Sequence, residues 1–323
     1  MPARASTAAI VKPMERKNNH RGEAQNRDVT QNRDVTLNRD VNSNHRIVVS
    51  LSCPDQPGIV HHVTGALFQA GGNIIESQQY GSQQTGTFFM RIEADVSLPT
   101  ADVEAQLRPV AEQFQMDLSV WDASAPLRTL IMCSKAPHAL EELLSRQHAG
   151  YLPIEVPLIV SNHTDLKPLA EFYGVPFAHI PVTKDNKPEA EAQLRELIAE
   201  HDIDLVVLAR YMQILTDELC TELAGRAINI HHSFLPSFKG ARPYHQAHAR
   251  GVKLIGATAH YVTSDLDEGP IIDQAVTPVR HDRTPEELVQ QGSATEAQTL
   301  ARAVRWHAQH RVLLDGHRTV VFD

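Results

Sequence analysis

The chain has 323 residues, of which 42% are hydrophobic, and a formal net charge of -9 at pH 7. This length predicts two domains, and no window supplies the roughly 20 apolar residues of a membrane-spanning helix, which excludes an integral membrane protein. Residues 1–46 hold nine Lys and Arg against five Asp and Glu, so the acidic excess lies in the main body and argues against a nucleic-acid surface.

The first 45 residues carry a short polar repeat. The motif Asn-Arg-Asp-Val recurs three times with a period of six residues between Gln25 and Asn42. One valine in each repeat cannot bury enough apolar surface to offset the entropy of the chain. We therefore expect residues 1–45 to form a disordered extension, and the pattern assigns no role to it.

Two features bear on where the protein works. Residues 1–14 lack the continuous apolar stretch of a secretory signal peptide. Cys53, Cys133 and Cys220 are an odd and widely separated set without a C-x-x-C pair, which disfavours a disulfide framework and a thiolate zinc site. We expect a cytoplasmic protein with reduced thiols.

Residues 46–122 predict a first domain. A strand at Ile47–Val49 leads through a turn at Pro54–Gly58 into a helix that ends at Gly71–Gly72. The apolar residues of this helix have the spacing of one buried stripe: Ile59, Val63, Ala66, Leu67 and Ala70. Further strands are predicted at 73–80, 87–96 and 116–121, and a second helix at 101–114. The β-α-β-β-α-β order is that of a ferredoxin-like fold.

After a linker at residues 123–126, residues 127–323 alternate strands with helices. Strands are predicted at 128–133, 155–160, 177–180, 205–208, 227–230, 254–262 and 318–322. Helices are predicted at 138–147, 166–173, 188–200, 216–223, 243–250 and 285–310. This α/β alternation predicts a Rossmann-like, mostly parallel sheet with helices on both faces.

The segment Ala227–Ser233 joins an apolar strand to polar residues at its end. Alternation along a strand places Asn229 and His231 on one face and directs His232 elsewhere. Ligands of open α/β sheets bind at the carboxyl ends of strands, so Asn229 and His231 are candidates for chemistry. Taken alone, the pattern also fits a strand that closes into a turn.

A second polar segment, His260–Pro270, begins at another predicted strand end and forms an acidic turn closed by Gly-Pro. A carboxylate from this turn, directed at His231, would favour the imidazolium and fix the ring. The pattern leaves Asp265, Asp267 and Glu268 as equal candidates. It also leaves open a solvated acidic turn without a catalytic role.

An Asn, a His and an Asp without a nucleophilic Ser or Cys suit direct attack of water or an amine on a carbonyl carbon. Asn229 would donate an amide N–H to the oxyanion, His231 would donate or shuttle a proton, and the carboxylate would orient His231. Ser233 lacks the G-x-S-x-G elbow of a serine hydrolase. His245 and His248 share a helix face, but they belong to no zinc motif, and we predict no metal site.

Three segments together resemble the formyltransferase family and, within it, the 10-formyltetrahydrofolate deformylases: Ala227–Pro236, Gly240–Ala247 and Gly256–Ile272. They occur in the family's order and spacing, and the resemblance covers residues 46–323. It implies that Asn229, His231 and Asp267 are catalytic and that the pterin ring lies against Arg210–Leu215 and the 262–267 loop. The implied substrate contacts are Arg210, Met212, Gln213, Ile214, Leu215, His260 and Val262.

The segment Asp55–Ile59, in its β-α-β-β-α-β setting, resembles the ACT domains, which often bind amino acids. The resemblance implies an amino-acid effector near Asp55, Gly58 and Asn73, and a purely structural or oligomerising domain is an equal alternative. We expect a homo-oligomer, because isolated ferredoxin-like modules often pair through their sheet edges.

The resemblance implies hydrolysis of 10-formyltetrahydrofolate to tetrahydrofolate and formate, with no metal and no redox cofactor. The glycinamide ribonucleotide formyltransferases of the wider family carry a glycine-rich phosphate loop after the first strand. Here Cys133–His138 takes its place, which removes the site for a sugar-phosphate acceptor and favours water. Two alternatives stay open: formyl transfer to an amine acceptor, and an amino-acid sensor whose second domain has lost activity.

Overall fold

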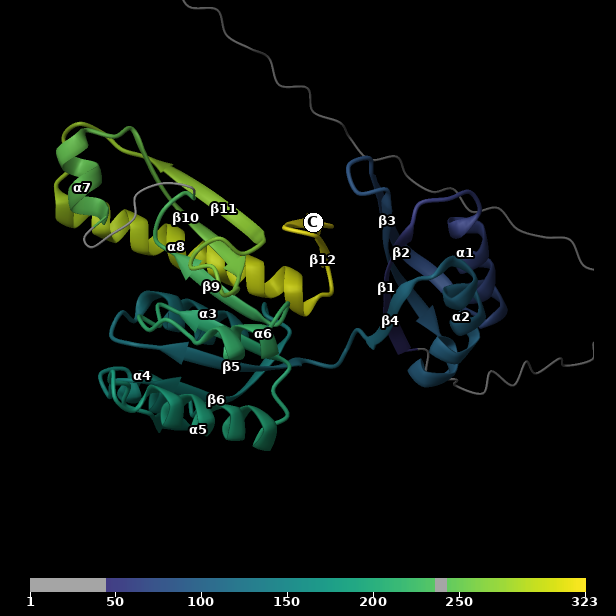
Figure 1. Ribbon diagram of the computed structural model, residues 1–323, viewed down its shortest axis with the longest axis horizontal. Helices are drawn as coiled ribbons and strands as arrows, with labels where there is room; N and C mark the ends of the chain where they lie inside the picture. The colour runs from purple at the N-terminus through teal and green to yellow at the C-terminus, as the bar shows by residue number, and fades with distance from the viewer. Residues whose placement is uncertain (1–44, 236–242) are drawn as a thin grey trace, which may run out of the picture. The chain divides into compact units, whose positions relative to one another are not determined.

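A computed structural model of the chain describes residues 45–235 and 243–323 (Figure 1). The expected disordered extension lies outside these residues, apart from His45, and so does part of the Gly240–Ala247 segment. Within the two described ranges, no helix has the length and apolar character needed to cross a membrane.

Residues 45–122 form a four-stranded antiparallel sheet with two helices. The elements are β1 (His45–Pro54), α1 (Ile59–Gln69), β2 (Asn73–Ser82), β3 (Thr87–Val96), α2 (Thr100–Phe114) and β4 (Asp117–Asp122). The strand order β2-β3-β1-β4 confirms the predicted ferredoxin-like fold. Alternate residues of β1, Ile47, Val49 and Leu51, are buried in one core with Leu67 of α1 and Leu107 of α2. Both helices therefore cover the same face of the sheet.

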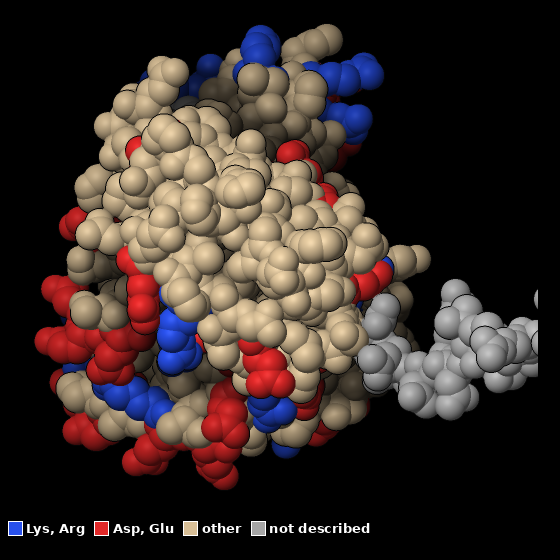
Figure 2. All heavy atoms as spheres, turned by 90° about the vertical axis from the view of Figure 1, so that its right-hand side faces the viewer, with Lys and Arg blue, Asp and Glu red and all other residues tan. Residues whose placement is uncertain are grey.

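The helix α1 contains no Lys, Arg, Asp or Glu. It leaves Phe68 74% exposed and Val60 37% exposed. Figure 2 faces the end of Figure 1 where α1 and α2 are labelled, and it shows a broad area of uncharged side chains bordered by charged ones. If another molecule covered this surface, few charged groups would lose their contact with water.

The strands of residues 127–278 form a seven-stranded sheet. They are β5 (Leu127–Cys133), β6 (Ile154–Ser161), β7 (Phe177–His179), β8 (Leu205–Ala209), β9 (Ala227–His231), β10 (Leu254–Tyr261) and β11 (Ile271–Pro278). Their order is β11-β10-β9-β8-β5-β6-β7. The five strands from β9 to β7 run parallel, whereas β10 and β11 pair antiparallel. The predicted mostly parallel sheet is confirmed, and β11 is an edge strand that the sequence pattern does not predict.

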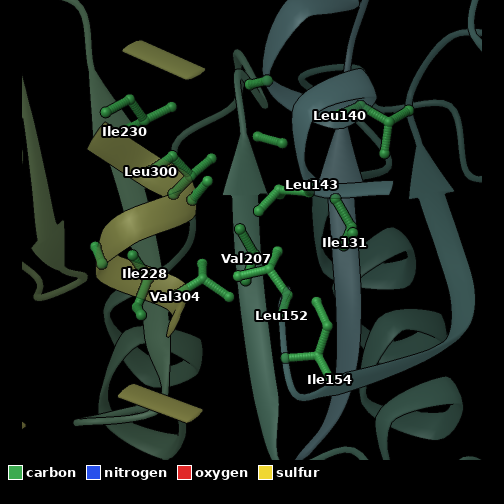
Figure 3. Packing of buried hydrophobic residues seen from close by; sticks show 14 of the residues in the cluster. Ile131, Leu140, Leu143, Leu152, Ile154, Val207, Ile228, Ile230, Leu300 and Val304 are labelled. Carbon is green, nitrogen blue, oxygen red and sulfur yellow. The ribbon is translucent and has the colours of Figure 1, made fainter. Parts of the chain in front are cut away.

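Helices cover both faces of this sheet. They are α3 (His138–His148), α4 (Lys167–Phe172), α5 (Lys187–Glu200), α6 (Asp217–Glu222), α7 (Pro243–Arg250) and α8 (Pro285–Ala308), and a hairpin of β12 (Val312–Asp315) and β13 (Arg318–Val321) follows. Alternation along β5 divides the core. Ile131 belongs to a cluster with Leu140 of α3 and Leu300 of α8 (Figure 3), whereas Met132 belongs to a cluster with Leu194 of α5.

Candidate active site

Asn229 and His231 lie at the carboxyl end of β9, beside β10. The register pairs Asn229 with His260 across the two strands. Nδ2 of Asn229 donates to Nε2 of His260 at 3.2 Å, and Nδ1 of His260 donates to the carbonyl oxygen of Tyr261 at 2.9 Å. These bonds orient the amide of Asn229 and use one of its two N–H groups.

The turn after β10 has a tightly constrained backbone. The N–H of Tyr261 donates to the carbonyl of Pro270 at 2.9 Å. Gly269 passes so close to Tyr261 that a Cβ atom at position 269 would lie 1.8 Å from the Tyr261 carbonyl oxygen. Asp267 has a left-handed φ of 59°, which Asp adopts more readily than most residues. The local sequence thus fixes where the Asp267 side chain emerges.

The carboxylate of Asp267 contacts two histidines. Its Oδ2 lies 3.2 Å from Nδ1 of His231, and its Oδ1 lies 3.7 Å from Nε2 of His260. Burial opposes ionisation of Asp267, but the neighbouring imidazoles outweigh it and hold the pKa of this carboxyl well below its usual range. Among the three carboxylates that the pattern left equal, Asp267 is the one that the fold brings against His231.

The contact with Asp267 determines which nitrogen of His231 is basic. Because Nδ1 faces a carboxylate, it carries the proton in the neutral ring, and the lone pair is on Nε2. That Nε2 is buried, and no described residue forms a hydrogen bond with it. His231 therefore has a basic nitrogen available to a bound molecule.

His232 does not point away from the site as strand alternation predicts. Its ring stacks on that of His231, with the centroids 4.6 Å apart and the planes at 25°. The reason is that β9 ends at His231, so the backbone at 232 no longer alternates as in a strand. Nδ1 of His232 lies 3.0 Å from Nη1 of Arg210.

A cavity of about 350 Å³ adjoins these side chains. It is lined by Asn229, His231 and Asp267 and by all seven residues expected to contact substrate: Arg210, Met212, Gln213, Ile214, Leu215, His260 and Val262. Three apolar lining residues, Met212, Ile214 and Leu266, are more than half exposed. The fold thus joins a cluster of polar groups to an apolar surface of the kind that accepts a flat ring.

The segment Cys133–His138, which replaces the phosphate loop of the wider family, supports the wall of the cavity. Oγ of Ser134, which follows β5, donates to Oδ1 of Asn162 at 2.7 Å and accepts from the N–H of Met212 at 3.0 Å. Ser134 therefore fixes the backbone of the 210–215 loop on which the exposed apolar residues lie.

Comparison with known proteins identifies the family of the chain. Residues 127–304 match the formyl transferase family model, and residues 45–121 match an ACT domain model. Formyltetrahydrofolate deformylase of Corynebacterium sp. strain P-1 is 52% identical over 279 residues, which are 85% of this chain and 98% of the relative. The chain belongs to the formyltetrahydrofolate deformylase family.

Solved structures separate this family from its relatives. A crystal structure of formyltetrahydrofolate deformylase from Burkholderia mallei is 48% identical with a TM-score of 0.84, covering 86% of this chain and all of that one. A glycinamide ribonucleotide transformylase from Symbiobacterium toebii is 32% identical with a TM-score of 0.57, covering 62% of this chain and 95% of that one. The deformylase match therefore spans more of the chain than the transformylase match.

A buried carboxylate network, absent from the sequence-based prediction, lies behind the site in this deformylase family member. Glu296 of α8 is 1% exposed and lies 3.4 Å from Nε of Arg210. It contacts Nε2 of His138 at 2.9 Å and accepts a hydrogen bond from the hydroxyl of Tyr244. Burial opposes its ionisation, but His138 and Arg210 outweigh this effect and lower the pKa of Glu296. An acidic residue in a long, Ala-rich helix gave no sequence signal of this role.

A second buried contact joins α8 to β10. The hydroxyl oxygen of Tyr261 and Nδ1 of His307 form a hydrogen bond of 2.7 Å. Burial lowers the pKa of His307 to about 4, so the ring is neutral.

The expected effector residues lie in the ACT domain but not together. Gly58 caps the start of α1 with a φ of 98°, a conformation that glycine adopts freely, and Asp55 precedes it. Asn73 begins β2, where it pairs with Asp95 of β3, while Pro54 pairs with Thr87 at the other end of β3. Within one chain, Asn73 is therefore at the opposite end of the sheet from Asp55 and Gly58.

The two helix histidines, His245 and His248, are exposed on α7. Across the described part of the chain, no group of three or more His, Cys, Asp or Glu residues is arranged to hold a metal ion.

Proposed function

We propose that the chain hydrolyses 10-formyltetrahydrofolate to tetrahydrofolate and formate. The observation that carries this proposal is the contact of Asp267 with Nδ1 of His231, which leaves the basic Nε2 buried and without a described partner next to Asn229 and the cavity. A base beside an amide donor is what the attack of water on a formyl carbon requires.

In the proposed reaction, the oxygen of a water molecule forms a bond to the formyl carbon while its proton passes to Nε2 of His231. The oxyanion accepts a hydrogen bond from Nδ2 of Asn229, and Asp267 stabilises the imidazolium. The C–N10 bond then breaks, N10 takes the proton from His231, and the product leaves as formic acid, which loses its remaining proton to solvent and becomes formate. No group outside the chain is needed to balance these steps, so we propose that no metal or redox cofactor takes part.

We further propose that the pterin ring binds against the 210–215 loop. The exposed apolar side chains of Met212 and Ile214 support this placement because they offer contact surface to a flat ring. Leu266 also lines the cavity and would supply a further apolar contact.

Release of formate in the absence of any acceptor tests this function. The purified chain is incubated with 10-formyltetrahydrofolate alone, and formate is measured over many turnovers. A formyltransferase would remain nearly inert until an amine acceptor is added, and a chain that acts as an amino-acid sensor would release no formate under either condition. Either result would exclude the hydrolase.

We also propose that the ACT domain binds an amino-acid effector and that the chain forms a homo-oligomer. Asp55 and Gly58 at the start of α1 support the first proposal, with Asn73 as a contact that would come from another chain. Exposed Ile74 and Ile75 on the edge strand β2 support the second. Calorimetry with a panel of amino acids and light scattering test these proposals in turn.

The three cysteines support the expected cytoplasmic location. Cys53, Cys133 and Cys220 are all buried and free, as they would be in a reducing compartment.

A further inference from the structure

Two stacked imidazoles line the same cavity, and each has an unsatisfied nitrogen. Nε2 of His231 and Nε2 of His232 are both buried, and neither has a hydrogen-bond partner among the described residues. Buried polar atoms in folded proteins nearly always have a partner, so two neighbouring exceptions call for a ligand or a water molecule.

Arg210 determines the proton position on His232. A guanidinium has donors and no acceptor, so Nδ1 of His232, 3.0 Å from Nη1 of Arg210, must accept. The neutral ring then carries its proton on Nε2. Arg210 is held in turn by Glu296, and Glu296 by Tyr244. The buried network therefore keeps Nε2 of His232 as an N–H donor.

The two rings are complementary toward a single water molecule. His231 offers a lone pair on Nε2, because its Nδ1 keeps the proton and donates it in a hydrogen bond to Asp267, and His232 offers an N–H on Nε2. The ring centroids are 4.6 Å apart. Because both residues line the same cavity, a water molecule bound there would donate a hydrogen bond to Nε2 of His231 and accept one from Nε2 of His232.

We propose that His232 is a further catalytic residue, whose Nε2–H donates a hydrogen bond to the oxygen of the attacking water. This inference rests on the proposed hydrolase function. His232 neither gains nor loses a proton in the reaction: the water's proton passes to His231, and the second lone pair of the water oxygen attacks the formyl carbon. Arg210 is a positioning residue that keeps His232 neutral and in this tautomer, and Glu296 is a positioning residue that holds Arg210 in place.

The first test replaces the donor. The variant His232→Leu removes the N–H at similar volume, and we expect kcat for formate release to fall by roughly 10²-fold with KM within about twofold. His232→Gln retains an N–H donor and should recover at least about tenfold of that loss. Exposed His281, in the turn after β11, provides the matched controls His281→Leu and His281→Gln, which should leave both constants unchanged.

A second arm separates water binding from general damage to the site. Hydroxylamine attacks the formyl carbon through its own nitrogen and gives formohydroxamate and tetrahydrofolate. If His232 holds water, His232→Leu should reduce hydrolysis at least about tenfold more than it reduces formohydroxamate production. Equal reduction of both products would overturn the proposal, and so would a kcat within twofold of the unmodified chain or a loss confined to KM.

A measurement on the unmodified chain guards against a variant that fails to fold. ¹⁵N NMR of histidine-labelled protein, with the His232 signals assigned by their absence in His232→Gln, reports which ring nitrogen carries the proton. We expect a protonated Nε2 and an unprotonated Nδ1 on His232 between pH 6 and 8. A proton on Nδ1 would overturn the proposal. Formate release by the unmodified chain is measured first, so failure of the hydrolase function is distinguished from failure of this inference.

Discussion

The backbone of Gly269 packs directly against the carbonyl oxygen of Tyr261, with no space for a side chain at position 269. This contact closes the turn that carries Asp267. A substitution at this glycine therefore tests whether the position of Asp267 matters, without any change to Asp267 itself.

We expect Gly269→Ala to lower kcat by roughly 10²-fold or more, because a displacement of about 1 Å in a catalytic group can have that effect. A Cβ at this position would lie 1.8 Å from a backbone oxygen, so the turn must shift. Gly65 of α1 is the matched control, since a Cβ there meets nothing within 4 Å. Formate release by Gly269→Ala at the rate of Gly65→Ala would contradict this role for the turn.

The charge of Asp267 is predicted to be essential. Asp267→Asn keeps the size of the side chain but no longer favours the protonated Nδ1 of His231, and we expect kcat to fall by at least about 10²-fold. Asp265→Asn removes a carboxylate two residues away and should stay within about twofold. Steady-state kinetics on both variants, with thermal unfolding to confirm folding, checks this assignment. Equal losses in the two variants would speak for a general effect of the acidic turn.

Loss of Arg210 should change the pH dependence. The pKa of His232 is lowered to about 4. Burial has the largest effect, followed by the charges of Arg210 and His231, and Glu296 and Asp267 act in the opposite direction. In Arg210→Gln this pKa should rise, so His232 becomes protonated at a higher pH. We expect the acid side of the kcat profile to move upward by on the order of one pH unit. Arg195→Gln, which breaks an exposed pair with Glu222, is the control. Superimposable profiles would contradict the prediction.

Stability should fall as the pH is lowered below about 6.5. His232 and His307 have pKa values of about 4 in the folded chain, against about 6.5 in an unfolded one. Between these values the unfolded chain binds more protons, so the free energy of unfolding decreases with falling pH, by on the order of 1–3 kcal/mol for each buried histidine. Thermal unfolding from pH 7.5 to 4.5 measures this. In His307→Gln the unfolding temperature should depend less on pH. An unfolding temperature of the unmodified chain that stays constant over this range would contradict the prediction.

The sequence predicts the part of the site that follows from strand ends. Asn229 and His231 alternate on β9, and ligands gather at the carboxyl ends of parallel strands, so their convergence is predictable. The choice of Asp267 over its acidic neighbours was not predictable from spacing, because it depends on a left-handed φ and on the Gly269 contact.

Three features escaped the pattern for physical reasons. His232 was assigned to the wrong side because alternation applies only as far as the strand extends, and β9 ends one residue earlier. Glu296 lies in a helix where no local motif marks it, and its partners come from α3, α7 and the segment after β8. The edge strand β11 has a mixed burial pattern, which period-two alternation does not detect.

The number of residues between Glu296 and His307 in α8 limits insertions and deletions in this helix. Eleven residues make just over three complete turns of an α-helix, so both side chains project from one side of a rigid rod, about 16 Å apart. Glu296 contacts Arg210, and His307 contacts Tyr261 of β10. Insertion or removal of a single amino acid between them would rotate one end by about 100° relative to the other. We therefore expect the helix to accept point substitutions on its outer side but no insertion or deletion between these two residues.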